Sequence, residues 1–245
     1  MIEEFVSIET NDGTMNTFIV GPERDGPWPV VVFLMDAPGM REEIRNMSRR
    51  IASAGYVVAA PHLYYRQVEH YNLFETGDRD RMFELMSSLS NDMVVDDARA
   101  VLAALAGKDA SQFAADTSTV GTVGYCMSGP FALYLAAKDE RIRCAASIHG
   151  VALVTEADDS PHLQLPDVAG EVYVGCAETD DYAPPKMIAA FEAALEDSGT
   201  AGEVEWYSGT EHGFAFAERP QYIQAASERH WERLHSLFSR KLGTK

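Results

Sequence analysis

The sequence predicts an α/β fold, a mostly parallel, twisted sheet of about eight strands with helices on both faces. An unbroken apolar run at 29–35 is typical of a strand buried on both faces. After this run, strand and helix patterns alternate to residue 241, as in doubly wound sheets. The 245 residues, 46% of them hydrophobic, suffice for one large core, so we expect a single domain over 1–245.

The expected elements follow from periodicity. A hairpin pairs 5–8 with 17–20 across the turn sequence Asn11-Asp12-Gly13. Further strands are expected at 29–35, 56–60, 120–124, 143–149, 171–176 and 204–207. Helices are expected at 41–54, 79–87, 92–106, 185–197 and 221–241, and from Gly129 onward. Residues 61–77 show no periodicity, and such a long loop in a compact domain is often functional.

Charge and composition limit the partners. Twenty basic and 38 acidic residues give a net charge of −18, which opposes binding to nucleic acid or anionic membranes and favours a small-molecule partner. The N-terminus lacks a signal-peptide pattern and no apolar run approaches a membrane span, so a cytoplasmic protein is expected. The chain has three cysteines, Cys126, Cys144 and Cys176, and no two of them form a C-x-x-C pair. This odd count and spacing predict reduced thiols. No zinc-like spacing occurs, and the oligomeric state cannot be read from the sequence.

The stretch Gly124-Tyr125-Cys126-Met127-Ser128-Gly129 joins a β-branched run to a stretch of helix formers. Small residues on both sides of a nucleophile leave room for a strained strand–turn–helix connection. This turn places the central side chain at a helix N-terminus, where backbone N–H groups and the helix dipole favour a thiolate. A free cysteine is also often just a small buried apolar residue, so the turn alone leaves both interpretations open.

Two further polar turns follow later strands, at the sheet edge where such folds place their sites. Glu178, Asp180 and Asp181 form the first turn, and His212 lies in the second. Nucleophile, acid and histidine thus occur in the chain order of α/β hydrolases, with an imidazole to accept the thiol proton and an acid to fix its tautomer. Among these three acids, the sequence spacing to Pro184 favours Asp180 as the partner of the histidine only weakly. An Asx turn at Asp180 and a backbone-capping role for His212 are the alternatives.

The remaining histidines are weaker candidates. His62 and His149 lie just beyond strands and could line a pocket, whereas His230 and His235 lie in a charged helix where solvent exposure is expected. The glycines around Cys126 do not form G-x-G-x-x-G, so no dinucleotide site and no cofactor are expected.

These motifs resemble the dienelactone hydrolase (carboxymethylenebutenolidase) family of α/β hydrolases over nearly the whole chain. The resemblance rests on the cysteine elbow, on the stretch from Gly55 to Arg66, and on Glu211-His212-Gly213-Phe214. It implies the α/β-hydrolase fold and a triad of Cys126, His212 and Asp180. It also implies hydrolysis of an enol-lactone through a thioester acyl-enzyme, with the N–H groups of Met127 and Ala37 as the oxyanion hole.

The chain departs from the family pattern at several positions. Asp36 stands where the family has a glutamate that helps to activate the thiol; it either keeps that role with a shorter reach or caps the next helix. His62 replaces an aspartate beside the expected pocket. Of two arginines that hold the substrate carboxylate in the family, one matches Arg79, with Arg81 close by, and the other falls at Phe216. The alternative for both Arg79 and Arg81 is a solvated position in the loop without contact to a substrate.

Loss of one charge-assisted contact, worth ~1.5–3 kcal/mol, favours a less charged or more hydrophobic substrate than the family's dienelactone. The sequence therefore predicts a metal-free thiol hydrolase of a small ester or (enol-)lactone. A non-catalytic, ligand-binding relative of the same fold is the alternative, which the departures at Asp36 and Phe216 favour. A thiol redox protein is a weaker one, because no second cysteine lies near Cys126 in the sequence.

Overall fold

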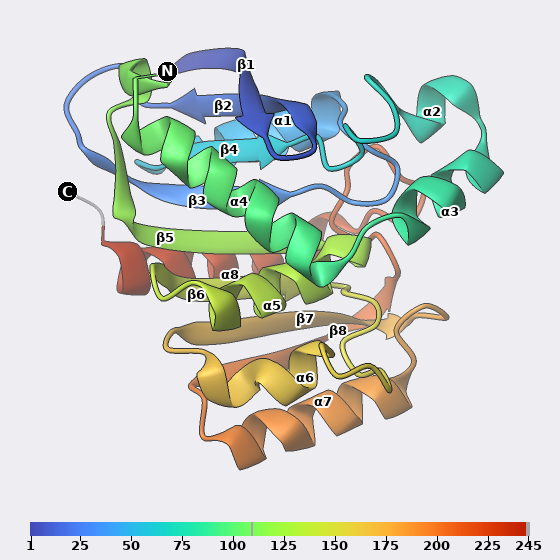
Figure 1. The fold of residues 1–245 in the computed structure, drawn as a ribbon. Helices are drawn as coiled ribbons and strands as arrows, with labels where there is room; N and C mark the ends of the chain where they lie inside the picture. The colour runs from blue at the N-terminus through green and yellow to red at the C-terminus, as the bar shows by residue number, and fades with distance from the viewer. Residues whose placement is uncertain (109, 244–245) are drawn as a thin grey trace. The chain divides into compact units, whose positions relative to one another are not determined.

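The computed structural model describes residues 1–108 and 110–243 and contains eight strands in the sheet order β1-β2-β4-β3-β5-β6-β7-β8 (Figure 1). The predicted mostly parallel sheet with helices is confirmed. The chain divides into two compact units, Met1–Val120 and Gly121–Gly243, and the expected single domain stays a prediction.

Four complete strands and the start of β5 lie in the first unit. The complete strands are β1 (Ile2–Thr10), β2 (Gly13–Gly21), β3 (Trp28–Leu34) and β4 (Val57–Pro61). The predicted hairpin is confirmed, with Phe5 opposite Phe18 across β1 and β2. Strand β2 is antiparallel to β4, and β4 is parallel to β3. The hairpin is longer than its apolar core suggested, and several of the added positions, such as Glu3, Glu9 and Asn16, are exposed and polar.

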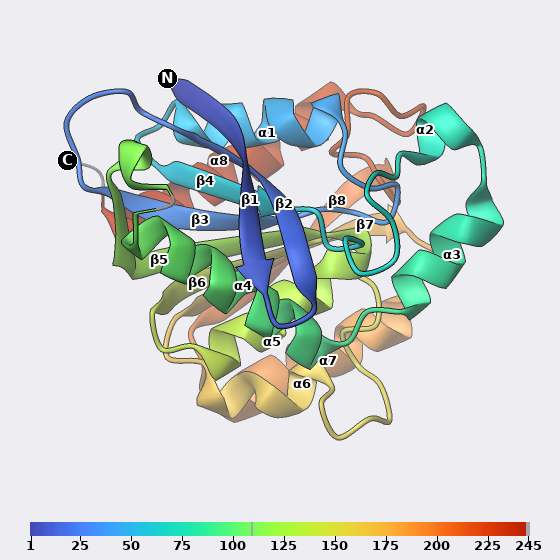
Figure 2. The same cartoon turned by 45° about the horizontal axis from the view of Figure 1, so that its top comes forward.

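Helices cover both faces of these strands. Figure 2 shows α1 (Glu42–Ala52) and α4 (Asn91–Ala106) on opposite sides of them. The short elements are α2 (Leu73–Thr76), α3 (Arg79–Ser87) and η1 (Ser111–Phe113). Helix α2 corrects the expectation of an unstructured loop over 61–77. It is a single turn capped by the Asn72 side chain and ended by left-handed Gly77, too short to show a periodic pattern.

The second unit carries three consecutive parallel strands, β6 (Ile142–Ile148), β7 (Glu171–Thr179) and β8 (Gly202–Glu211). Strand β5 (Ala115–Tyr125) leads into it. The helices are η2 (Cys126–Ser128), α5 (Gly129–Lys138), α6 (Pro161–Gln164), η3 (Leu165–Asp167), α7 (Pro185–Ser198) and α8 (Gln224–Leu242). Helices α5 and α8 contact β6 from opposite faces (Figure 2).

Helix α8 corrects one sequence expectation. His230 is fully buried rather than solvated, whereas His235 is half-buried. The reason is helical spacing, because His230 lies on the same face as the buried Ser227, Leu234 and Leu237. Its ring contacts the Tyr125 hydroxyl through Nε2 at 3.1 Å. Within the described residues, no helix has both the length and the apolar character needed to cross a membrane.

Candidate active site

Cys126 occupies the turn between β5 and α5. Its φ of 55° lies in the left-handed region, where a residue with a side chain is strained by about 1–2 kcal/mol. The chain passes from strand through η2 into α5 within three residues. The side chain of Cys126 is partly exposed, whereas Cys144 and Cys176 are buried. Such strained connections are typical of nucleophile elbows.

Two glycines make this turn possible. A Cβ atom on Gly124 would lie 1.9 Å from the Ser128 carbonyl oxygen. A Cβ on Gly129 would lie 2.6 Å from the Cα of Gly150. The backbone of the elbow is also tied to the segment after β6, because the Val151 N–H donates to the Cys126 carbonyl oxygen at 3.1 Å. The small residues seen in the sequence therefore allow close backbone contacts.

Asp180 follows β7 just beyond a register shift between β7 and β8 at Ala177 and Thr179. Irregularities of this kind re-aim side chains at strand ends. The buried carboxylate accepts through Oδ1 from the N–H groups of Tyr182 at 2.9 Å and Ala183 at 3.0 Å. The Asx-turn interpretation is therefore correct for one oxygen, and it leaves Oδ2 for a second partner.

That second partner is His212, whose Nδ1 lies 2.7 Å from Oδ2 of Asp180. The two other acidic candidates are placed differently. Glu178 is exposed and accepts from the Gly209 N–H, and the side chain of Asp181 is exposed. Of the three acids considered from the sequence, the structure thus brings Asp180 to the histidine.

The environment of His212 favours its protonated form. Burial alone disfavours the charge, but hydrogen bonding to Asp180, together with the nearby Cys126 thiol, outweighs burial and raises the pKa of His212 to about 9. The Nε2 atom is buried and makes no hydrogen bond of normal geometry within the described residues. Cys126 thus lies within electrostatic reach of the ring without an aligned hydrogen bond, as is common before substrate binds.

Two aromatic rings flank His212. The ring of His149 lies 4.7 Å from it between centroids, at an interplanar angle of 60°. The ring of Tyr182 lies 5.1 Å away on an exposed residue. Phe216 is fully buried, 5.3 Å from Tyr125 and 5.6 Å from His149. Met127, also buried, follows Cys126 in η2 at the start of α5.

In the first unit, Asp36 lies buried just after β3 and forms a two-pronged ion pair with Arg41. One prong joins Nη1 and Oδ1, and the other joins Nη2 and Oδ2 at 3.1 Å. The suggestion that Asp36 caps the next helix is wrong, because Arg41 is the N-cap residue of α1. The neighbouring Ala37 accepts from the Tyr64 hydroxyl through its carbonyl oxygen at 2.9 Å. Roles for Asp36 and the Ala37 N–H in a reaction stay predictions.

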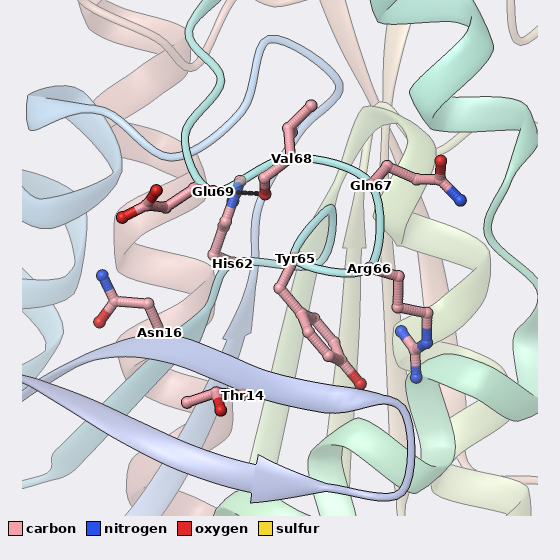
Figure 3. A pocket seen from close by; sticks show the side chains of 8 residues that line it. All are labelled: Thr14, Asn16, His62, Tyr65, Arg66, Gln67, Val68 and Glu69. Carbon is pink, nitrogen blue, oxygen red and sulfur yellow. Dashed lines mark hydrogen bonds between the residues drawn. The ribbon is translucent and has the colours of Figure 1, made fainter.

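His62 lies directly after β4 and is buried. Burial lowers the pKa of its imidazole to about 4, against the opposing effect of its backbone hydrogen bond to Val68. The neutral ring therefore donates from Nε2 to the Val68 carbonyl oxygen at 3.2 Å. It lines a cavity of about 300 Å³ in the first unit (Figure 3). The other lining residues are Thr14, Asn16, Tyr65, Arg66, Gln67, Val68 and Glu69.

Both candidate substrate-binding arginines belong to the first turn of α3. Arg79 is exposed, and its guanidinium lies 6.0 Å from the centroid of the Phe83 ring. Arg81 forms an ion pair with Glu84 at 2.9 Å on the surface. A contact with substrate stays a prediction for both arginines, and also for His62 and Phe216.

The contacts of Arg41, Tyr182 and His149 were not predicted from the sequence. Of the three, His149 alone had a visible signal, its position just beyond a strand. The partners of all three residues depend on tertiary packing. No three histidine, cysteine, aspartate or glutamate side chains in residues 1–108 and 110–243 are grouped so as to hold a metal ion.

Comparison with known proteins places the chain among relatives of similar length. A carboxymethylenebutenolidase of Pseudomonas putida is 26% identical over 249 residues, which cover 98% of this chain and 100% of that protein. A crystal structure from Klebsiella pneumoniae, provisionally described as a dienelactone hydrolase, has a TM-score of 0.87 at 24% identity and 98% coverage of both chains. A dienelactone hydrolase-like promiscuous phosphotriesterase from metagenomic libraries has a TM-score of 0.82 at 20% identity and 99% coverage of both chains.

These two structures establish likeness of fold. The sequence model of the dienelactone hydrolase family matches residues 15–242, a span that includes the cysteine elbow, Asp180 and His212. The chain belongs to the dienelactone hydrolase family.

Proposed function

We propose that this protein hydrolyses small carboxylic esters or lactones through a thioester on Cys126. Membership of the dienelactone hydrolase family supports the ester or lactone class. The observation that carries the mechanism is the position of His212, which is hydrogen-bonded to Asp180 at 2.7 Å and has a pKa raised to about 9 by Asp180 and Cys126 despite its burial. A buried imidazole poised in this way can take the thiol proton and keep it.

In the first half-reaction, the Cys126 thiolate attacks the carbonyl carbon of the substrate and forms a C–S bond, while the carbonyl oxygen takes the negative charge. The N–H of Met127 follows the nucleophile directly and is the donor expected at that oxygen. Collapse of this intermediate breaks the ester C–O bond. The leaving oxygen takes the proton from His212, and a thioester remains. With a lactone substrate, the leaving oxygen stays tethered to the acyl group.

In the second half-reaction, His212 removes a proton from a water molecule as the water oxygen attacks the thioester carbon. The C–S bond then breaks, which releases the carboxylic acid and restores the thiolate beside protonated His212. Asp180 keeps the Nδ1 proton of the ring in place throughout, so that Nε2 performs each proton transfer. Asp36 and the N–H of Ala37 remain candidates for assistance, as the family resemblance implies.

Replacement of the nucleophile tests this proposal. Cys126→Ala should abolish hydrolysis of p-nitrophenyl acetate, and intact-protein mass spectrometry should detect an acetylated wild-type enzyme but no acetylated variant. Cys176→Ala is the matched control, because it removes a buried thiol of the same unit and should keep turnover. Circular dichroism verifies that both variants fold. Full activity in Cys126→Ala would sink the proposal.

Thiol alkylation gives a second test that needs no mutation. Burial raises the pKa of both Cys144 and Cys176 to about 12, so these thiols stay protonated and shielded. Iodoacetamide should therefore modify Cys126 first under native conditions, with a parallel loss of activity. If peptide mass spectrometry finds Cys126 to be the slowest of the three, the proposed thiolate is wrong. Saturable ligand binding without turnover of any ester would instead support the non-catalytic alternative.

A further inference from the structure

His149 is a buried histidine whose ring nitrogens make no hydrogen bond within the described residues. The side chain follows β6 and is only 1% exposed. Each buried, unsatisfied polar group costs about 1–3 kcal/mol, a cost that an apolar ring at this position would avoid. An imidazole held here at such a cost calls for a functional explanation.

The backbone around His149 has a strained conformation and is fixed by hydrogen bonds to neighbouring segments. Of the five non-glycine residues with left-handed φ in the described part of the chain, three are Cys126, His149 and Ala152. The φ of His149 is 39°, and its N–H donates to the Gly175 carbonyl oxygen at 2.7 Å. Two residues later, the Val151 N–H donates to Cys126. The segment that presents His149 is thus fixed to the elbow, and strain of this kind clusters at functional sites.

The ring of His149 packs among aromatic groups, and its shortest ring contact is with His212. The two imidazoles lie 4.7 Å apart at 60°. Phe216, Phe214 and Tyr125 lie farther away, with centroid distances of 5.6, 5.7 and 5.9 Å. In this surrounding of low polarity, the dipole of a neutral imidazole acts strongly on a neighbouring charge.

We infer that His149 is a positioning residue that holds the ring of His212 and stabilises its protonated form through the dipole of a neutral imidazole. The inference rests on the proposed function, in which His212 carries the proton of Cys126. It extends that function by giving the second histidine a separate task, because His149 touches His212 and takes no part in bond making.

The charge states of the two rings fit this division. Burial lowers the pKa of His149 well below its ordinary value, and electrostatic interactions with the nearby His212, Arg219 and His230 lower it further. The phenol of Tyr125 on β5, whose ring lies 5.9 Å from that of His149, is a further polar group near it and is hydrogen-bonded to His230 on α8. The pair of rings therefore binds one proton, and that proton resides on His212.

Two variants separate polarity from packing. His149→Phe keeps an aromatic ring but removes both nitrogens, so the alkaline limb of the kcat/KM profile should move about one pH unit lower, a tenfold change in the His212 equilibrium. The ultraviolet absorbance of the Cys126 thiolate at neutral pH should fall as well. His149→Asn restores a polar group and tolerates left-handed backbone, so its profile should return toward that of the wild type.

A matched control is His230→Phe, which removes another buried imidazole of this unit. His230 is hydrogen-bonded to the Tyr125 hydroxyl and to the Ser227 carbonyl oxygen, so its loss should lower stability without moving the alkaline limb. An unchanged limb and thiolate absorbance in His149→Phe would overturn the inference, even if the melting temperature fell. Cys126→Ser serves as the blank for thiolate absorbance. A wild-type protein that matches this blank would refute the proposed function instead.

Nitrogen-15 NMR of the wild-type histidine rings tests the same inference on the unaltered protein, and a variant is needed only to assign the signals. The His149 nitrogens, assigned from the spectrum of His149→Asn, should report a neutral ring at every pH at which His212 titrates. A His149 ring that gains a proton together with His212 would overturn the inference.

Discussion

The Nδ1 atom of His212 lies 2.7 Å from Oδ2 of Asp180, while the other oxygen of the same carboxylate accepts two backbone N–H groups. The two backbone N–H groups therefore fix the orientation of the carboxylate through Oδ1, and this orientation directs Oδ2 toward His212. A fixed acceptor at Nδ1 keeps a proton there and leaves Nε2 as the nitrogen to which our proposal assigns the proton transfers. The geometry thus assigns the tautomer of the histidine as well as its orientation.

Asp180→Asn should lower kcat/KM by about 10³–10⁴-fold, because an amide nitrogen opposite Nδ1 favours the wrong tautomer. The fold should survive, since the amide oxygen can still accept from Tyr182 and Ala183. Asp181→Asn is the matched control, because its exposed side chain is one residue away, and its kcat/KM should equal that of the wild type. Steady-state kinetics with p-nitrophenyl acetate measures both. Equal losses in the two variants would refute the assignment of the acid.

His212 should make stability depend on pH in the alkaline range. Its pKa rises from 6.5 in the unfolded chain to about 9 in the folded protein, through the net effect of burial, Asp180 and Cys126. A raised folded pKa means that the stabilisation is fully present below pH 6.5 and is lost as the pH passes 9. The shift corresponds to about 3 kcal/mol.

The comparison that isolates this effect uses His212→Gln. Urea unfolding at pH values from below 6.5 to above 9 should show that the wild type is more stable than the variant at the acidic end. The gap between the two free energies of unfolding should close toward the alkaline end. A gap that widens with rising pH would contradict the raised pKa of His212.

Local sequence signals were sufficient for part of the candidate site. Gly124 and Ser128, the small residues that flank Cys126, predicted a tight elbow, and the structure explains Gly124 by a contact with the Ser128 backbone that a Cβ would block. His212 was visible as a polar residue just past a strand. Such features depend on a few neighbouring residues, and these were already present in the sequence.

Other features depend on packing that no local pattern records. The residues alone favoured Asp180 over Glu178 and Asp181 only weakly, because the register shift between β7 and β8 that precedes these carboxylates cannot be read from a local pattern. The burial of His230 was missed because charged neighbours along α8 masked its inward-facing position. The eight-strand architecture was predictable because a two-sided sheet requires long apolar runs, whereas the one-turn helix α2 contains too few residues to form a pattern.

The ion pair between Asp36 and Arg41 should be costly to break on one side. Both side chains are buried, so Arg41→Met leaves a buried carboxylate without its partner, which should lower the free energy of unfolding by about 3–5 kcal/mol. The double variant Asp36→Asn/Arg41→Met removes both charges and should lose less. Arg81→Met provides the surface control, because its pair with Glu84 is exposed and worth about 0–1 kcal/mol. Urea denaturation measures all three, and a double variant less stable than Arg41→Met would contradict the argument.

Gly124→Ala should disable the elbow through the backbone. The added Cβ would lie 1.9 Å from the Ser128 carbonyl oxygen, so the turn must open and Cys126 must move. A displacement of about 1 Å at a nucleophile costs on the order of 10²-fold in rate. Gly77→Ala is the matched control, because Gly77 has φ of 67° but open space around it, so its variant pays only about 1–2 kcal/mol of left-handed strain. We expect Gly77→Ala to keep the wild-type kcat/KM at a lower melting temperature. A Gly124→Ala enzyme with unchanged kcat/KM would show that the contact at Ser128 does not set the position of Cys126.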